Sequence, residues 1–378
     1  MLFLDTYGPF LIVSLIILRA RGHKRLFLTA LFSAYLAHFP KQPSLIYHNN
    51  LTNQKIVSHL KSTQVRFFPH LLLPNGFAQS FIDKYRPSKI KCENRIYLDL
   101  KDDKVVLDIY EPTTPAKSTV LLVHGFNGSS DSAYITMMAY HLLNKKYRVI
   151  AFNARGVNTT LNSPVFFHIG WTNDIRCCID YILKTYDGSL TLIGFSLGGN
   201  WVTKLMGEDV FNTPKYDRVT QGIAISLPFD FAKIRDYINK SLLRVILNKY
   251  VSNNYKKYFL RHSEIYKEHL NKILECYTVD GIDDLLTLKI FNFQSLDEYY
   301  ARNSCVSFIP KIRKPLLIVN SLDDPVIPEC TIPVEICKTN ENVILVLFKK
   351  GGHIGFFGND WNMTSAEKLV IEYMESER

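Results

Sequence analysis

The sequence has few of the features that mark a metal-binding, disulfide-stabilised or nucleic-acid-binding protein. Its seven cysteines are odd in number, and no two of them form a C-x-x-C pair. This pattern predicts neither a zinc site nor a disulfide framework, and it is typical of a reducing compartment. The chain has no low-complexity tract, internal repeat or nucleic-acid-binding motif that we recognise. We therefore expect a folded protein that uses no metal and no cofactor.

A chain of 378 residues can bury a large core, and its length fits one large domain with an extension better than two equal domains. Hydrophobic residues make up 47% and charged residues 21%, as in a globular protein. The formal net charge of +10 favours an anionic partner, either nucleic acid or a membrane surface. Because the N-terminus is apolar, we expect a membrane and no nucleic acid.

Residues 1–39 are predicted to form a hydrophobic membrane anchor. Two apolar runs, 2–18 and 26–39, are separated by a basic cluster at 19–25. The first run approaches the roughly 20 residues that a spanning helix needs, and the second falls short. We therefore expect a single pass through the membrane. An interfacial or buried helix pair is the alternative. By the positive-inside rule, the basic cluster after the first run lies on the cytosolic side, which places the rest of the chain in the cytosol.

Residues 40–94 are predicted to be a connector or ordered arm, and residues 95–378 an α/β domain. A hairpin is expected over 95–110. Continuous apolar strands then alternate with helices, which predicts a mostly parallel, eight-stranded sheet with helices on both faces. Buried strands are expected at 118–124, 147–153, 190–193, 221–227, 315–320 and 343–348, with helices at 132–143, 171–186 and 365–374.

A helical insertion is expected between two strands of this sheet, at about residues 229–300. This region contains no strong strand pattern and is rich in Tyr, Leu, Lys and Arg. Its apolar stripe at 242–247 lies among lysines and arginines, which would suit a lid on an anionic membrane surface. An ordinary helical subdomain with a solvated basic face is the alternative.

The strongest motif is Gly194-Phe195-Ser196-Leu197-Gly198, which joins an apolar strand to a helix. A G-x-S-x-G sequence in this context is typical of a nucleophile elbow, where a strained turn exposes the serine. The two glycines allow close approach to neighbouring backbone. The motif predicts that Ser196 is a catalytic nucleophile, and the alternative is a glycine-rich turn with an inert serine.

An acid and a histidine follow Ser196 along the chain, each after a predicted buried strand. The carboxyl ends of parallel strands form the edge where α/β active sites lie, and this places Asp324 and His353 near Ser196. The order Ser196, Asp324, His353 is that of α/β-hydrolases. Asp324 is preferred over Asp323 because it directly precedes a Pro-Val-Ile-Pro turn. Asp323 is expected to support the turn instead.

A second loop is expected to complete the site. His124-Gly125-Phe126 follows an earlier strand as an HG-type loop, so the N–H groups of Phe126 and Leu197 are predicted to form an oxyanion hole. His124 itself is expected to brace the loop rather than to act as an acid or base. Arg155 is expected to brace the same edge, with no catalytic role.

Together these segments resemble the AB hydrolase 4 family of membrane-associated α/β-hydrolase-domain proteins. That family includes yeast medium-chain ethyl-ester esterases and animal phospholipases. The resemblance covers residue 95 to the C-terminus and rests on HGFNGSS from His124, FNARG from Phe152, GWTNDI from Gly170, GFSLGGN from Gly194, DEYYARNS from Asp297, NSLDDPVIP from Asn320 and GGHIGF from Gly351. It implies an α/β-hydrolase fold and a serine hydrolase of acyl esters and lipids.

The sequence thus predicts a membrane-bound serine hydrolase of lipid esters that works through an acyl-enzyme on Ser196. Acylglycerols, phospholipids or medium-chain fatty-acid esters are the expected substrates. Two alternatives remain open. The acyl group could pass to an alcohol instead of water, although no histidine has an acid five positions on, so an H-x4-D acyltransferase signature is missing. The fold could also serve as a non-catalytic lipid-binding protein.

Overall fold

The structure is a computed structural model, and it describes residues 22, 25–26, 28–29, 41–92, 94–238 and 242–376, with the side chains at 242–246 excepted. The anchor predicted over residues 1–39 lies almost entirely outside this range. Within the described ranges, no helix is both long enough and apolar enough to cross a bilayer.

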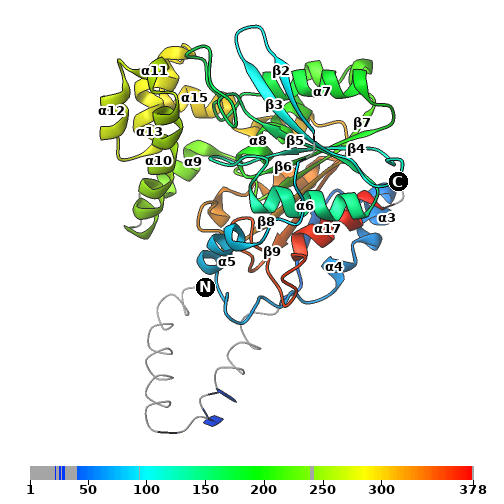
Figure 1. The fold of residues 1–378 in the computed structure, drawn as a ribbon. Helices are drawn as coiled ribbons and strands as arrows, with labels where there is room; N and C mark the ends of the chain where they lie inside the picture. The colour runs from blue at the N-terminus through cyan, green and yellow to red at the C-terminus, as the bar shows by residue number, and fades with distance from the viewer. Residues whose placement is uncertain are drawn as a thin grey trace.

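A single sheet of nine strands runs through the described part of the chain (Figure 1). In spatial order the strands are β1 (Ser44–Tyr47), β9 (Val343–Phe348), β8 (Leu316–Ser321), β7 (Val219–Ile225), β6 (Leu190–Phe195), β4 (Thr119–Val123), β5 (Arg148–Asn153), β3 (Lys104–Tyr110) and β2 (Asn94–Asp99). Strands β4 to β9 pair in parallel, and β1, β2 and β3 pair antiparallel at the two edges. The predicted mostly parallel sheet is confirmed.

The sheet has one strand more than the eight predicted, because the connector contributes β1. Ser44 and Tyr47 pair with Leu347 and Ile344 of β9. The strand is only four residues long and mostly half-buried, so its sequence shows neither the continuous apolar run of a central strand nor a clear alternation. An edge strand of this kind is formed by the hydrogen bonds that its neighbour offers, and local sequence gives little sign of it.

The central strands are apolar throughout because helices cover both faces of the sheet. In β4, Leu121 and Val123 belong to one buried cluster, and Val120 and Leu122 belong to the other. The first cluster includes residues of α7 (Asn173–Thr185) and α8 (Leu197–Gly207). The second includes residues of α3 (Leu51–His59), α6 (Ala133–Asn144) and α17 (Ser365–Met374). Alternate residues of one strand thus enter two separate cores, as expected for a covered parallel sheet.

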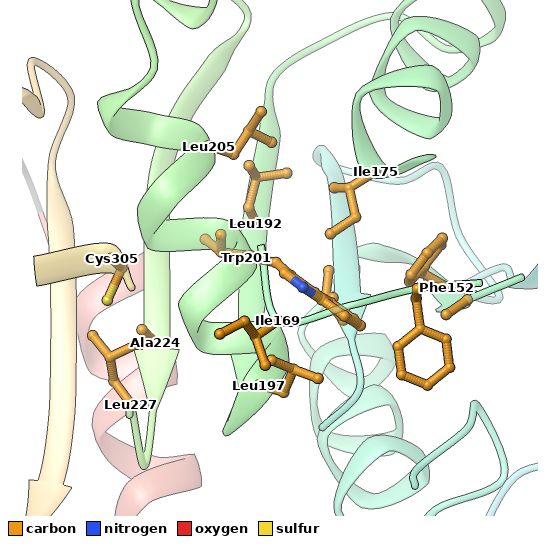
Figure 2. Close-up of a cluster of buried hydrophobic side chains, with 14 of the residues drawn as sticks. Phe152, Ile169, Ile175, Leu192, Leu197, Trp201, Leu205, Ala224, Leu227 and Cys305 are labelled. Atoms are coloured by element: carbon orange, nitrogen blue, oxygen red, sulfur yellow. The ribbon is translucent and has the colours of Figure 1, made fainter. Parts of the chain in front are cut away.

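Trp201 occupies the centre of the first core. It projects from α8 with Leu192 of β6, Ile175 of α7 and Phe152 of β5 around it (Figure 2). The side chain is 1% exposed, and its indole N–H donates to the carbonyl of His168 at 2.9 Å. A buried indole N–H needs such an acceptor, so this contact joins α8 to the loop of His168 that precedes α7.

The predicted insertion between β7 and β8 is helical in the structure. Figure 1 shows these helices gathered on one side of the molecule, and α10 lies next to the connector helix α5, where the rings of Phe81 and Tyr250 are 6.1 Å apart. They are α9 (Phe231–Ile238), α10 (Leu242–Arg261), α11 (Ser263–Tyr266), α12 (Leu270–Glu275), α13 (Val279–Ile282), α14 (Leu288–Ile290) and α15 (Leu296–Asn303). The apolar stripe predicted at 242–247 falls largely on side chains that the structure does not describe.

Besides β1, the described part of the connector forms α3, α4 (Lys61–Gln64), α5 (Gly76–Ile82) and the 3-10 helix η1 (Asp83–Tyr85). One further helix, α16 (Val334–Thr339), joins β8 to β9. The connector therefore packs along the edge of the sheet that carries β9, next to the loop of His353.

Candidate functional site

Ser196 occupies a strained turn between β6 and α8. Its backbone has φ 52° and ψ −118°, outside the regions that residues with a side chain normally adopt. The turn is held because the Ser196 N–H donates to the carbonyl of Ile225 at 2.8 Å. Close packing also demands glycine on both sides. A Cβ at Gly194 would lie 2.2 Å from the carbonyl oxygen of Gly198, and one at Gly198 would lie 2.3 Å from that of Val123.

The structure brings the side chains of Ser196, His353 and Asp324 into one hydrogen-bonded chain. His353 Nε2 lies 2.9 Å from Ser196 Oγ, and His353 Nδ1 lies 2.8 Å from Asp324 Oδ2. The three residues come from the ends of β6, β8 and β9, which are separated by up to 157 positions in sequence. Because Asp324 accepts at Nδ1, that nitrogen carries the proton, and Nε2 can accept the serine proton.

The second oxygen of Asp324 is fixed by its own turn. Asp324 Oδ1 accepts from the N–H groups of Val326 at 2.7 Å and Ile327 at 3.0 Å. The side chain is 0% exposed, whereas that of His353 is 16% exposed. The carboxylate is thus buried but fully hydrogen-bonded, and it can orient the imidazole without being protonated itself.

Asp323 points at different partners. Its Oδ1 accepts from the N–H groups of Gly351 at 2.9 Å and Gly352 at 3.0 Å, and from Ser321 Oγ at 2.7 Å. Lys350 Nζ lies 3.6 Å from the other oxygen. Asp323 therefore holds the glycine turn that precedes His353, and its contacts are those of a supporting carboxylate.

The predicted oxyanion-hole residues both border Ser196. Leu197 is the first residue of α8, so its N–H belongs to the helix turn that lacks intrahelical acceptors. Phe126 lines the same two cavities as Ser196. The loop that carries Phe126 lies close to Ser196, since a Cβ at the preceding Gly125 would lie 3.1 Å from Ser196 Cβ. The positive end of the α8 dipole also points toward this position.

His124 lies behind the site as a brace. Its Nδ1 donates to the carbonyl of Gly125 at 2.7 Å, and its Nε2 accepts from the N–H of Ala154 at 3.1 Å. Complete burial lowers the pKa of His124 to about 4, so the ring is neutral and joins the loops after β4 and β5. Arg155 serves the same edge through a buried two-point contact with Asp174 at 2.7 and 2.8 Å.

The residues that sequence reasoning missed belong to α5, in the connector. The N–H of His353 donates to Ser80 Oγ at 2.7 Å, and Ser80 Oγ in turn donates to the carbonyl of Gly76 at 2.6 Å. Gln79 is fully buried and bonds the backbone of Phe357 twice, accepting from its N–H at 2.7 Å and donating to its carbonyl at 3.0 Å. Helix α5 therefore clamps the loop that carries His353.

The sequence gives little sign of this clamp. Serine and glutamine in a short helix have no spacing that distinguishes them from solvated residues, and the partners lie 273 and 278 positions away. The one local sign is Gly76, where a Cβ would lie 1.8 Å from the carbonyl oxygen of Asp323. A glycine at a helix start, however, has many other causes.

Two cavities meet at Ser196. The first, of about 150 Å³, is lined mainly by apolar side chains of the helical insertion, among them Ile234, Leu247 and Val251. The second, of about 800 Å³, contains His353 and opens between α5 and α10. A third cavity of about 700 Å³ lies around Trp171 and Arg302 and includes none of the three hydrogen-bonded residues. An ester at Ser196 would have an apolar pocket on one side and a wider opening on the other.

The polar end of the first cavity contains a buried acid pair. Asp283 is 3% exposed, and it accepts from Thr287 Oγ1 at 2.6 Å. Tyr300 donates its hydroxyl to Asp280 at 2.8 Å. Burial raises the pKa of Asp283 to about 7, and the neighbouring Asp280 adds to the shift. In the described residues, no group of three or more His, Cys, Asp or Glu side chains is arranged to hold a metal ion.

The fold and the order of these residues at the strand ends define an α/β hydrolase. Comparison with known proteins agrees: residues 118–360 match the family described as "alpha/beta hydrolase fold". The chain is 31% identical over 302 residues to monoacylglycerol lipase ABHD2 of Danio rerio, covering 74% of this chain and 69% of that protein. It is 31% identical over 291 residues to abhydrolase domain-containing protein 2 of Drosophila melanogaster, covering 71% and 73% respectively.

A monoacylglycerol lipase of Saccharomyces cerevisiae is 29% identical over 271 residues, which cover 66% of this chain and 58% of that protein. The chain belongs to the AB hydrolase superfamily, within its AB hydrolase 4 family. It is a carboxylic-ester hydrolase.

Proposed function

We propose that the chain is a serine hydrolase that cleaves carboxylic esters of lipids through an acyl-enzyme on Ser196. Acylglycerols, phospholipids and medium-chain fatty-acid esters are the substrate classes. The observation that carries the proposal is the hydrogen-bonded chain from Ser196 Oγ through the His353 ring to Asp324, at 2.9 and 2.8 Å. Names of relatives such as "Monoacylglycerol lipase ABHD2" support a lipid ester as substrate.

In the proposed reaction each residue has one part. His353 Nε2 takes the proton of Ser196 as Oγ attacks the ester carbonyl carbon, and Asp324 stabilises the resulting imidazolium. The N–H groups of Leu197 and Phe126 donate to the carbonyl oxygen as it becomes an anion. The C–O bond to the alcohol then breaks, and His353 returns its proton to the leaving oxygen. Water attacks the acyl-enzyme by the same steps and releases the fatty acid.

The two cavities suggest where the halves of the substrate lie. The apolar cavity, lined by Ile234, Leu247 and Val251, suits the acyl chain. The wider cavity on the His353 side suits the alcohol, since His353 must protonate that oxygen when it leaves. In this proposal the helices of residues 229–300 act as a lid, and residues 1–39 anchor the chain to a membrane with the 95–378 domain in the cytosol.

Labelling with a fluorophosphonate probe tests the proposal. Such probes bond covalently to activated serines, so we expect one labelled serine in the wild-type chain and none in Ser196→Ala. Hydrolysis of p-nitrophenyl esters from about two to sixteen carbons should fall by ~10⁴ or more in kcat in the variant. Wild-type turnover should be fastest on medium or longer chains. A wild-type chain that neither reacts with the probe nor hydrolyses any ester of the series would refute the proposal.

A further inference from the structure

Large apolar side chains are exposed together on one side of the molecule. The apolar rim, as we call this group, consists of Phe68, Leu71, Leu72, Phe81, Tyr85 and Tyr250, whose side chains are 39% to 77% exposed. Five of the six come from one stretch of the connector, residues 68–85. Single exposed apolar residues are common on protein surfaces, but five within one short stretch of chain indicate an interaction site.

The rim borders the opening of the catalytic site. Phe81 of α5 and Tyr250 of α10 lie with their ring centres 6.1 Å apart, and both line the wide cavity that contains Ser196 and His353. The other end of the rim lies against the His353 loop, since the N–H of His70 donates to the carbonyl of Phe357 at 3.0 Å. The rim therefore runs from this loop to the mouth of the cavity.

The apolar N-terminal sequence joins the described fold beside the rim. The N–H of Phe67 donates to the carbonyl of Lys41 at 2.9 Å, so the chain enters directly next to Phe68. The preceding residues 2–39 contain the two apolar runs. The predicted anchor therefore connects to the described fold at a point next to Phe68.

The charges around the mouth are predominantly positive. Lys84, Lys257 and Arg261 line the wide cavity and are exposed. Of the two acids of the same cavity, Asp83 is paired with the guanidinium of Arg86 at 3.4 Å, whereas Asp131 accepts from the neutral amide of Asn158 and leaves one negative charge against the three cations. An exposed apolar group edged by cations favours a surface that is apolar below and anionic above.

We propose that the apolar rim docks on a lipid bilayer that contains anionic lipids, so that the mouth between α5 and α10 opens into the headgroup layer. The proposal rests on the proposed function and deepens it by naming the surface through which a lipid ester enters. A protein partner is disfavoured because it would cover the cavity that the substrate must enter. Docked in this way, the catalytic face receives an ester without its passage through water.

Charge placed in the rim tests the proposal in the full chain. The rim variant carries both Leu71→Glu and Leu72→Glu. The control variant carries both Tyr97→Glu and Val210→Glu. Tyr97 and Val210 are also exposed, at 54% and 44%, and Figure 1 shows β2, which carries Tyr97, at the opposite end from α5. Rates are measured on a long-chain monoacylglycerol in vesicles of phosphatidylcholine with phosphatidylserine, and on soluble p-nitrophenyl butyrate.

We expect the rim variant to lose on the order of tenfold in its rate on vesicles, because two exposed leucines that docking would bury in the bilayer are replaced by charges. Its rate on the soluble ester should stay unchanged, and the control should match the wild type on both. Equal rates of rim variant and control on vesicles would overturn the proposal. So would an equal fall of the rim variant on both substrates, which would show that the leucines support the fold and not the docking.

A native reporter tests docking without any assay of activity. Trp361 is 42% exposed and its ring lies 4.7 Å from that of His70, whereas Trp201 is 1% exposed in the core. Vesicles that contain brominated phosphatidylcholine should quench the Trp361 emission, and this quenching should vanish in Trp361→Phe. Quenching should weaken when phosphatidylserine is omitted. Absence of Trp361 quenching would overturn the docking surface even if the esterase itself is active, so the two proposals can fail separately.

Discussion

Two neighbouring carboxylates illustrate how position decides chemistry at the scale of single residues. Asp324 turns one oxygen to the imidazole of His353 and the other to two backbone N–H groups. Asp323 turns an oxygen to the N–H groups of Gly351 and Gly352. One residue in sequence therefore separates a carboxylate that orients the imidazole from one that shapes the loop holding it.

This division predicts different effects of one substitution. Asp324→Asn should lower kcat on a soluble ester by ~10⁴, because an amide cannot stabilise the imidazolium and can favour the wrong tautomer. Asp323→Asn should cost roughly tenfold or less, because the amide oxygen can still accept from the glycine N–H groups. Steady-state kinetics of the two purified variants measure this. If Asp323→Asn is the more damaging change, the acid has been assigned to the wrong residue.

The buried Asp283 should make stability depend on pH. Its pKa is raised to about 7 by burial, so the folded state holds a proton that the unfolded chain has released. The contribution of Asp283 to the free energy of unfolding should therefore fall as pH rises from about 4 to about 7. Asp283→Asn removes the effect, and the melting temperature of the variant relative to wild type should increase between about pH 5 and about pH 8. A difference that stays constant across this range would contradict the assignment.

At the scale of elements, α5 acts as a clamp on the loop of His353. The helix is seven residues long, yet it supplies Ser80 to the His353 backbone and Gln79 to Phe357. Gly76 at its first turn allows contact with Asp323. A helix from the connector thus helps to position a residue from the far end of the chain.

The clamp predicts that Ser80 is a positioning residue. Ser80→Ala leaves the His353 N–H without its acceptor, which costs ~1–3 kcal/mol and should lower kcat by roughly tenfold. KM for a small soluble ester should change little. The matched control is Ser58→Ala, since Ser58 is exposed on α3 and its hydroxyl donates to the carbonyl of Lys55 in the same helix. If both variants keep full kcat, or if Ser80→Ala only lowers the melting temperature, the positioning role is refuted.

For the whole molecule, the connector takes part in the fold from Lys41 onward. The Lys41 carbonyl already accepts from Phe67, and β1 follows at Ser44. The connector belongs to the body, since β1 extends the sheet and α5 holds the His353 loop.

Two truncations should therefore behave differently. Removal of residues 1–39 should shift the protein from the membrane fraction toward solution, while hydrolysis of a small soluble ester persists. Removal of residues 1–93 should abolish that hydrolysis, because β1 and the α5 clamp are lost together. Fractionation by ultracentrifugation and the soluble-ester assay measure both. A full-length chain that washes off membranes in carbonate would argue against a spanning segment and leave an interfacial one.

Local patterns in the sequence determined much of this protein. The last strand and the last helix were predicted with the bounds observed, at Val343–Phe348 and Ser365–Met374. Continuous apolar runs predicted the parallel strands. The alternation of apolar strands with helices stops after residue 228, and this predicted the helical insertion. These signals are local, since burial on both faces of a strand or one face of a helix constrains each residue by its own neighbours.

The tertiary structure decided what depends on partners distant in sequence. Strand β1 exists because β9 offers it hydrogen bonds, and α5 acts as a clamp because Gln79 and Ser80 meet a loop more than 270 positions away. The apolar rim likewise arises only when connector and α10 are brought together. The local sequence around a polar residue in a short helix is the same whether that residue faces solvent or a buried backbone N–H. Only the folded chain, in which a buried polar group without a partner costs free energy, distinguishes the two.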